Sequence, residues 1–333
     1  MSQARVVCFG ELLIRLTATG GHLLESLPPL ALCVGGAEAN VAVGLRRLGH
    51  ATKMVSVVAD NALGHAAIGE LRRWGVDVDA VTTIPGRMGL YFLTPGAIHR
   101  PSDILYDRAG SAFTEGDFGA IDWADTLSGA EWLHVSGITA ALGANCVAAA
   151  LSAMAAARSM GLHVAYDCNF RPKLWQAWGG DAPDLIRQLV SRADLVFGGQ
   201  RDIELIAGRT FASGRDAADH AFEAFPLLQR LVSTRRGQVN VDHNRLSGLM
   251  FTRAETLETR TWDIERIVDR IGGGDAFAAG VFHGLLTGLS DSQSLDYGLA
   301  CACLKHAQPG DASLATVAEL EDFLSEGGFD VRR

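Results

Sequence analysis

The chain has 333 residues, of which 48% are hydrophobic and 20% are charged, and its formal net charge at pH 7 is −9. A chain of this length and composition can bury a large hydrophobic core, as globular proteins do. The acidic balance, without any run of basic residues, argues against a nucleic-acid-binding surface. It leaves room for a site that binds an anionic small molecule, because a pocket can differ in charge from the whole protein.

Short apolar runs alternate with helical patterns along most of the sequence. The apolar runs predict strands at 6–9, 54–58, 132–135, 163–166, 195–197 and 231–233. Helices are predicted at 37–48, 62–74, 144–160, 184–191, 201–207, 274–286, 292–306 and 317–326. Near-continuous apolar strands separated by helices predict an α/β fold, a doubly wound and mostly parallel sheet with helices on both faces. No linker divides the chain, so we expect a single domain over residues 1–333.

Two regions depart from this alternation, at about 12–16 and 89–108, where strand patterns follow one another without helices between them. We expect these strands to form a small antiparallel sheet outside the main one. A small sheet over the strand ends would act as a lid that excludes water from a reaction. Its open edges also favour a homo-oligomer that forms through the lid strands.

The first strand pattern begins near the N-terminus, without the charged region and cleavage site of a signal peptide. The six cysteines are scattered and form no Cys-x-x-Cys pair. We therefore expect reduced thiols and a cytoplasmic protein. The alanine-rich stretch 140–160 is the strongest candidate for a membrane span, but it contains Asn145, Ser152 and Arg158 and is expected to be a packed helix.

A run of three glycines, Gly272, Gly273 and Gly274, leads into Asp275 at the start of a predicted helix. Free amides at a helix N-terminus bind anions, and glycines let the backbone approach a phosphate closely. A carboxylate beside an anion site repels the anion unless it has a chemical role. Accepting the proton of an attacking hydroxyl is such a role, so the segment predicts phosphoryl transfer to an alcohol.

Other common site signatures are missing from the sequence. The three lysines follow Thr52, Pro172 and Leu304, so no Gly-Lys-Ser/Thr phosphate loop exists. The first predicted strand is followed by GELLIRL instead of a dinucleotide-binding glycine motif. The histidines are spread singly, and the Cys301-Ala-Cys303 pair lacks a second pair of zinc ligands.

A second glycine motif lies near the N-terminus, where Gly35 and Gly36 precede Asn40 and an apolar helix pattern. Paired glycines allow backbone contact with a small polar ligand, and Asn40 offers both a donor and an acceptor. Together, GGAEANVAVGLRRLG and DRIGGGDAF resemble the two signatures of the ribokinase-like (PfkB) carbohydrate kinases. The second signature usually reads D-T-x-G-A-G-D; Gly273 replaces the usual alanine and Arg270 the usual threonine.

This resemblance implies a ribokinase-like fold with a β lid and the phosphorylation of a sugar hydroxyl by ATP with Mg²⁺. Asp275 would be the base, and the amides of Gly272–Gly274 would hold the charge that develops on the phosphoryl group. The resemblance assigns nucleotide binding to Ser233, Arg235, Gly237, Asp269, Gly272 and Gly274. It also assigns metal support, through water, to Asp202, and it allows a monovalent cation near Asp269, although nothing in the spacing requires one.

Three further segments resemble 2-keto-3-deoxygluconate kinases in particular: ILYDRAGSA at 104–112, DCNFRPKLW at 167–175 and LKHAQPGD at 304–311. The resemblance implies that Gly36, Tyr91, Tyr106, Arg108 and Arg171 line the sugar site. Arginine suits the carboxylate of a sugar acid because its planar donors bind both oxygens.

The expected activity is phosphorylation of 2-dehydro-3-deoxy-D-gluconate at its 6-hydroxyl. Fructokinase, 5-dehydro-2-deoxygluconokinase and a kinase for the galactonate epimer stay open as alternatives, because these substrates differ at only a few groups. A nucleoside kinase of the same fold is disfavoured, because a nucleoside substrate has no carboxylate for Arg108 to neutralise. A sugar or nucleotide sensor without catalysis is an alternative of another class, which the presence of Asp275 disfavours.

Overall fold

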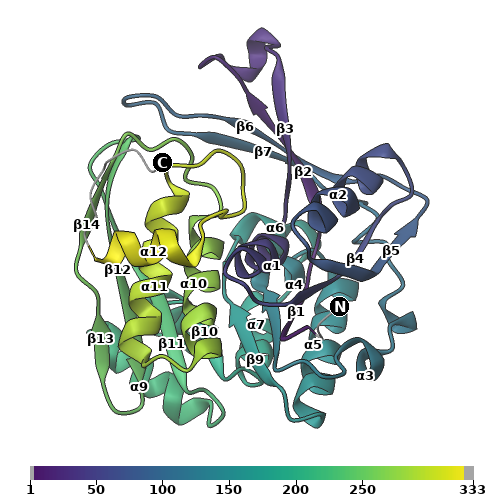
Figure 1. Cartoon of the computed structure of the whole chain (residues 1–333). Helices are drawn as coiled ribbons and strands as arrows, with labels where there is room; N and C mark the ends of the chain where they lie inside the picture. Colours follow the sequence, from purple (N-terminus) through teal and green to yellow (C-terminus); the bar gives the residue numbers. More distant parts are fainter. Residues whose placement is uncertain (1–3, 326–333) are drawn as a thin grey trace.

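The computed structural model describes residues 4–325, and a ten-stranded mixed sheet runs through its centre (Figure 1). The strand order is β13-β12-β11-β10-β9-β8-β1-β4-β5, and β14 also pairs with β12. Strands β11, β10, β9, β8, β1, β4 and β5 are parallel to their neighbours in this order, whereas β12, β13 and β14 pair in antiparallel fashion. The predicted doubly wound α/β fold is confirmed.

The strands of the large sheet are β1 (Val6–Phe9), β4 (Thr52–Ala59), β5 (Asp77–Ile84), β8 (Trp132–Ser136), β9 (His163–Asp167), β10 (Leu195–Phe197), β11 (Arg230–Gln238), β12 (His243–Thr252), β13 (Thr256–Glu258) and β14 (Trp262–Glu265). The longer helices are α1 (Ala37–Arg47), α2 (Ala62–Arg73), α5 (Ala144–Ser159), α6 (Pro172–Trp178), α7 (Ala182–Val190), α8 (Gln200–Ala207), α9 (Gly214–Ala224), α10 (Gly273–Thr287), α11 (Asp291–Lys305) and α12 (Val317–Leu324). Short helical turns lie at η1 (Leu24–Ser26), η2 (Phe118–Ala120), α3 (Trp123–Thr126) and α4 (Gly137–Ala140).

Each face of the large sheet has its own hydrophobic core, because successive side chains of a strand point to opposite faces. In β1, Val7 and Phe9 belong to a core that also contains residues of α5, α7, α8 and α9. Val6 and Cys8 pack on the other face with residues of α1, α2, α10 and α11. The buried strands therefore read as continuous apolar runs, which is why the sequence pattern located them.

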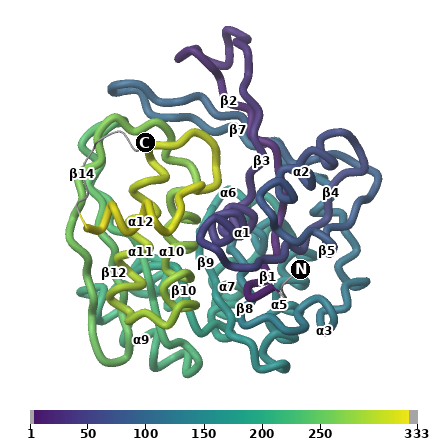
Figure 2. Tube along the Cα trace, in the orientation of Figure 1, coloured from purple at the N-terminus to yellow at the C-terminus, as the bar shows by residue number. Residues whose placement is uncertain are grey.

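The second sheet has four strands in the order β3-β2-β6-β7 and projects beyond the main layers at one end of the molecule (Figure 2). Its strands are β2 (Leu13–Ala18), β3 (Leu30–Gly35), β6 (Gly89–Thr94) and β7 (Asp103–Asp107). The expectation of a purely antiparallel patch was wrong, because β2 and β6 pair in parallel. The chain between these strands passes through α1, β4, α2 and β5, and such a long crossover permits parallel pairing where a hairpin would not.

Several elements lacked a clear pattern in the sequence. Strand β5 has the sequence DVDAVTTI and is half exposed at the edge of the sheet, so its apolar signal is weak. Strands β3, β12, β13 and β14 and helices α6 and α9 were also not predicted. The predicted helix at 317–326 ends at Leu324 in the structure, and residue 326 lies outside the described residues.

All six cysteines lie in the described part of the chain, and none forms a disulfide there. Within residues 4–325, no helix combines the length and the hydrophobicity that a membrane crossing requires.

Candidate active site

A cavity of about 410 Å³ lies where the small sheet meets the carboxyl ends of the parallel strands. Open α/β sheets bind ligands at this edge, where connections leave neighbouring strands in opposite directions. Here β1 lies between β8 and β4, and the loops after β1 and β9 both reach the cavity. We call it the Asp275 cavity. Several residues that the sequence analysis proposed for the site line its walls: Gly36, Asn40, Tyr91, Tyr106, Arg108, Arg171, Gly272, Gly273, Gly274 and Asp275.

A second cavity, of about 960 Å³, opens beside strands β10 and β11. We call it the Ser233 cavity, and its walls also include Asp202, Arg235 and Phe277. The two cavities share four wall residues, Asp167, Asn169, Arg236 and Gly274. They are therefore neighbouring compartments that meet at the N-terminus of α10.

Asp275 lies in the first turn of α10 and accepts a hydrogen bond of 2.7 Å from the side-chain amide of Asn40. Burial raises the pKa of Asp275 to about 7, although the Asn40 bond and the charge of Arg171 oppose this shift. A general base works best when its pKa lies near the working pH. Asp275 thus has both the position and the pKa of a proton acceptor at neutral pH.

The glycine turn before Asp275 adopts a conformation that only glycine takes easily. Gly272 caps α10 with a φ of +77°, and a Cβ atom there would lie 1.7 Å from the backbone oxygen of Asp311. A Cβ on Gly273 would lie 3.2 Å from the ring of His306, whereas one on Gly274 would meet open space. The turn is pressed against the loop at Asp311 and leaves its Gly274 side open.

The first amides of α10 are available to a ligand. Ala276 donates the first helical hydrogen bond, to the carbonyl of Gly272 at 2.8 Å, and Gly273 donates a long bond of 3.4 Å to Arg270. Among the described residues, the amides of Gly274 and Asp275 have no acceptor. They are the uncommitted donors at the positive end of the helix.

Two of the carboxyl groups that line the Asp275 cavity but were not predicted as site residues have raised pKa values. Burial, together with the charges of Asp275 and Asp202, raises the pKa of Asp167 to about 8. Glu38 accepts hydrogen bonds from the Ser136 amide (2.8 Å) and the Thr139 hydroxyl (2.7 Å), and burial still raises its pKa to about 7. The negative charge of the site is therefore partly suppressed by protonation near neutral pH.

Three arginines that line the Asp275 cavity, Arg171, Arg236 and Arg270, form no ion pair or side-chain hydrogen bond with any other described residue. Burial and the positive charge of Arg270 lower the pKa of Arg236. Arg171 lies directly before α6, and its charge lowers the pKa values of Asp167 and Asp275. Unpaired cations around one cavity indicate that it binds an anionic ligand.

Arg108 lines the Asp275 cavity and also forms an ion pair with Glu11. Its Nε donates to Glu11 at 2.9 Å, its Nη2 makes a second contact with the same carboxylate, and Ser111 donates to the other Glu11 oxygen at 2.6 Å. Both charged side chains are almost fully buried. The charge of Arg108 is thus already balanced within the protein, and its guanidinium also lies 5.8 Å from the centre of the Tyr106 ring.

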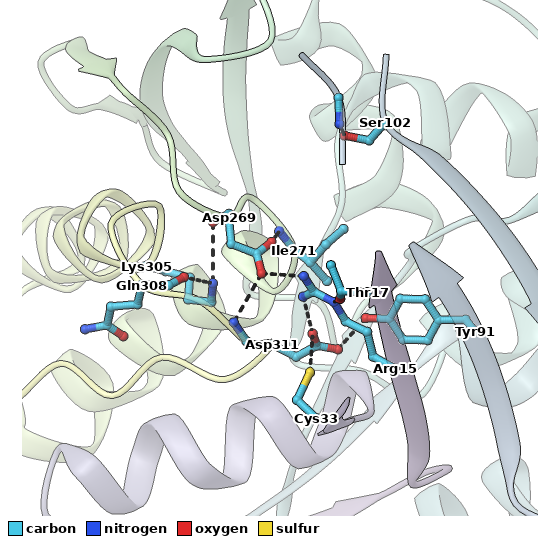
Figure 3. Close-up of polar contacts among 12 residues, drawn as sticks. Arg15, Thr17, Cys33, Tyr91, Ser102, Asp269, Ile271, Lys305, Gln308 and Asp311 are labelled. Atoms are coloured by element: carbon cyan, nitrogen blue, oxygen red, sulfur yellow. Dashed lines mark hydrogen bonds and ion pairs between the residues drawn. The ribbon is translucent and has the colours of Figure 1, made fainter. Parts of the chain in front are cut away.

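Figure 3 shows the contacts that tie the small sheet to the body of the protein. Arg15 of β2 bridges Asp269 (2.6 Å) and Asp311 (2.7 Å), and the Tyr91 hydroxyl donates to Asp311 at 2.6 Å. The carboxylate of Asp269 also accepts bonds from the amides of Ile271 and Gly310. The structure therefore gives Asp269 a bridging position, and it lines neither cavity.

Two other predicted residues also lie outside both cavity walls. Gly35 ends β3, and a Cβ atom there would lie 2.2 Å from the carboxylate of Asp311. Gly237 lies in the exposed part of the β11–β12 hairpin, opposite Arg245.

In the Ser233 cavity, Asp202 accepts a hydrogen bond of 2.8 Å from the amide of Gly199, and burial raises the pKa of Asp202.

A family model described as pfkB family carbohydrate kinase matches residues 3–317. The chain belongs to the pfkB family of carbohydrate kinases. A 2-dehydro-3-deoxygalactonokinase of Haloferax volcanii is 32% identical and aligns over 99% of this chain and 99% of its own length. A 2-dehydro-3-deoxygluconokinase of Bacillus subtilis is 29% identical over 96% of this chain and 95% of its own.

The fold agrees with solved pfkB-type kinases. The crystal structure of 2-dehydro-3-deoxygluconokinase from Thermotoga maritima superposes with a TM-score of 0.91 at 32% identity, over 97% of this chain and 100% of that one. The family resemblance read from the two glycine motifs, which lie at opposite ends of the sequence, is therefore confirmed.

In this pfkB-family kinase, the residues that sequence reasoning missed are mostly charged: Glu11, Glu38, Asp167, Arg236, Arg270 and Asp311. All of them except Glu11 stand inside or next to a motif that was recognised, so proximity to a motif was the available signal. What the motifs did not reveal is which charges pair with one another and which stay unpaired.

Proposed function

We propose that this protein transfers the γ-phosphoryl group of ATP to the 6-hydroxyl of 2-dehydro-3-deoxy-D-gluconate. The observation that carries the proposal is the junction of the two cavities at Gly274, beside Asp275. A sugar in the Asp275 cavity and a nucleotide in the Ser233 cavity would meet there. The names and near-complete alignment of the relatives support a keto-deoxy sugar acid as the substrate.

In this proposal, Asp275 accepts the proton of the sugar hydroxyl as the oxygen attacks phosphorus. The free amides of Gly274 and Asp275 and the cations Arg236 and Arg270 stabilise the negative charge of the transferred group. These groups are arranged before the substrate arrives, so little reorganisation is needed during the reaction. Asn40 orients the Asp275 carboxylate through its hydrogen bond.

Arg171 is the proposed partner of the substrate carboxylate, because its guanidinium pairs with no acid among residues 4–325 and it lines the Asp275 cavity. Arg108 supports the same wall, but its bond to Glu11 leaves less of its charge for a ligand. Tyr106 and the Gly36 backbone complete the sugar-binding wall in this proposal. The hydroxyl of Tyr91 is committed to Asp311, so the Tyr91 ring contributes mainly shape.

The nucleotide would bind along Ser233, Thr234 and Arg235 of β11, with its phosphates toward Gly274. Magnesium takes one or two carboxylates and keeps several waters when it binds with ATP. Asp167 and Asp202 fit this need, because both line the Ser233 cavity and lie near enough that the charge of Asp202 raises the pKa of Asp167. When bound, magnesium neutralises charge on the bridging phosphate oxygens.

The galactonate epimer is a second candidate substrate. It is favoured by the Haloferax volcanii relative, which aligns over 99% of both chains. The two substrates differ in the configuration of one hydroxyl, and such a difference is discriminated by individual polar contacts in the site.

A substrate panel tests the proposed function. ADP formation is measured with ATP and Mg²⁺ on both keto-deoxy acids, 5-dehydro-2-deoxy-gluconate and fructose. We expect the highest kcat/KM for a 2-dehydro-3-deoxy acid, and faster turnover of fructose would contradict the proposal.

Asp275→Asn should lower kcat by ~10²–10⁴-fold while ATP still binds. The exposed Asp79→Asn serves as the matched control and should leave kcat unchanged.

The small sheet is proposed to act as a lid and as the surface through which two copies associate. Its outer face carries the cross-strand row Leu32, Leu16, Phe92 and Leu105, and Leu32 and Leu105 are 60% and 58% exposed. Two such faces could stack as the sheets of a sandwich do. Leu32→Glu should shift a dimer to monomer in sedimentation, whereas Leu227→Glu, far from this face in the sequence and also exposed, should not.

A further inference from the structure

Lys305 is a fully buried cation for which the proposed chemistry has no use. It is one of three lysines in the sequence, ends helix α11 and has 0% of its surface exposed. Its ammonium group donates to the backbone oxygens of Gln308 at 3.0 Å and Asp269 at 3.5 Å (Figure 3). A lysine is rarely buried so completely without a carboxylate partner, which calls for an explanation.

The two oxygens that bind Lys305 belong to two separate loops. Asp269 begins the glycine turn that leads to Asp275, and Gln308 belongs to the loop that continues to Asp311. These loops touch directly, because the amide of Gly310 donates to Asp269 at 3.1 Å and Gly272 packs against the backbone oxygen of Asp311. The ammonium group therefore joins the two loops on which the position of the α10 N-terminus depends.

Lys305 lies among charges of both signs. Arg15 is the neighbouring cation, and Asp269, Asp311 and Asp275 are the neighbouring acids. Arg15 ion-pairs with Asp269 and Asp311, and these acids favour the charged form of Lys305 while burial lowers its pKa. A cation that binds backbone carbonyl oxygens in a dry site resembles a bound potassium ion in its chemistry.

We propose that the ammonium group of Lys305 acts as a built-in monovalent cation, which fixes the glycine turn on the 308–311 loop and replaces a bound potassium ion there. A free cation at this position would need the backbone oxygens of Asp269 and Gln308, and Lys305 already binds both. Lys305 is thus a positioning residue, acting through the backbone of Asp269 on the amides of Gly274 and Asp275. This role in catalysis rests on the proposed kinase function.

The test compares the wild type with Lys305→Ala and Lys305→Met in KCl, NH₄Cl, NaCl and choline chloride at equal ionic strength. ADP is measured directly by chromatography, so that no coupling enzyme adds its own need for a cation. Alanine removes the charge and opens space for an ion, whereas methionine removes the charge and keeps the space filled. Thermal unfolding of each protein is recorded in the same salts.

We expect the wild type to have the same kcat in KCl and choline chloride. In choline chloride, Lys305→Ala should lose kcat by about 10–100-fold, as expected for a misplaced reactive group. Potassium or ammonium ions should restore much of this loss in Lys305→Ala and little of it in Lys305→Met. A residue with a merely structural role would not be rescued by an ion of a particular size.

Activation of the wild type several-fold by potassium would overturn the proposal, because it would require a free cation site in addition to Lys305. Equal behaviour of the alanine and methionine variants in all four salts would also overturn it. If the wild type phosphorylates no sugar of the panel, the proposed function fails separately. A rise in Tm in KCl that is specific to Lys305→Ala would then still support the cation replacement, and its absence would refute it.

Discussion

The side-chain amide of Asn40 lies 2.7 Å from the carboxylate of Asp275, although the two residues are 235 positions apart in the sequence. This bond connects the first turns of α1 and α10, the two helices that begin with the glycine motifs. It also lowers the pKa of Asp275 against the stronger effect of burial.

Removing this bond should move the pH dependence of catalysis. In Asn40→Ala, the ionised form of Asp275 loses a hydrogen bond, so its pKa should rise above about 7. The acidic limb of the kcat/KM profile should then move to higher pH by roughly one to two units, since a bond to a charged group contributes ~1.5–3 kcal/mol. The remote Asn145→Ala is the control. If the acidic limb does not move in Asn40→Ala, Asn40 does not set the pKa of the base Asp275.

Arg171 should decide the preference for an acid over a neutral sugar. We expect Arg171→Met to raise KM for the keto-deoxy acid by about 10–100-fold, as the loss of a charge-assisted contact predicts. KM for a neutral sugar should change little, because that substrate has no carboxylate. Steady-state kinetics on both substrates measures the ratio of the two KM values. An equal change in KM for both would indicate that Arg171 binds a phosphate group or only packs in the site.

Arg108 should matter for stability as well as for the sugar. Arg108→Met leaves the buried Glu11 without its ion partner, which should cost ~3–5 kcal/mol in the free energy of unfolding. Adding Glu11→Gln removes the uncompensated charge, so the double variant should be more stable than Arg108→Met alone. Urea unfolding measures the free energy of unfolding of the single and the double variant. A double variant that is no more stable would show that the charge of Glu11 is not what destabilises the single variant.

Two glycines at opposite ends of α10 offer a matched comparison of backbone conformation and contact. Gly272 and Gly288 have φ angles of +77° and +76°, but only a Cβ on Gly272 would strike another residue. Each alanine substitution should cost ~1–2 kcal/mol for the left-handed conformation. Gly272→Ala should additionally weaken ATP binding in calorimetry, while Gly288→Ala should bind ATP normally. Equal losses of ATP binding would mean that contact with the Asp311 loop is unimportant.

The sequence alone determined the α/β class, the positions of the main strands and the family, because buried strands and glycine turns leave local patterns that need no partner to be recognised. It also brought Gly36, Asn40, Gly274 and Asp275 together through two motifs of one family. The pairing of charges was decided only by the tertiary structure. Arg108 and Arg171 look alike as arginines in a motif, yet the first is neutralised by Glu11 and the second forms no ion pair within the described part of the chain.

The same limit explains why the contacts of Asp269 with Arg15 and with the loop of Gly310 were not predicted, and why Lys305 passed without notice as a site residue. The parallel contact between β2 and β6 was likewise invisible in the alternating pattern of each strand. Electrostatic pairing and strand register depend on which distant segments become neighbours. That choice is made by the packing of the whole chain, and short stretches of sequence carry little information about it.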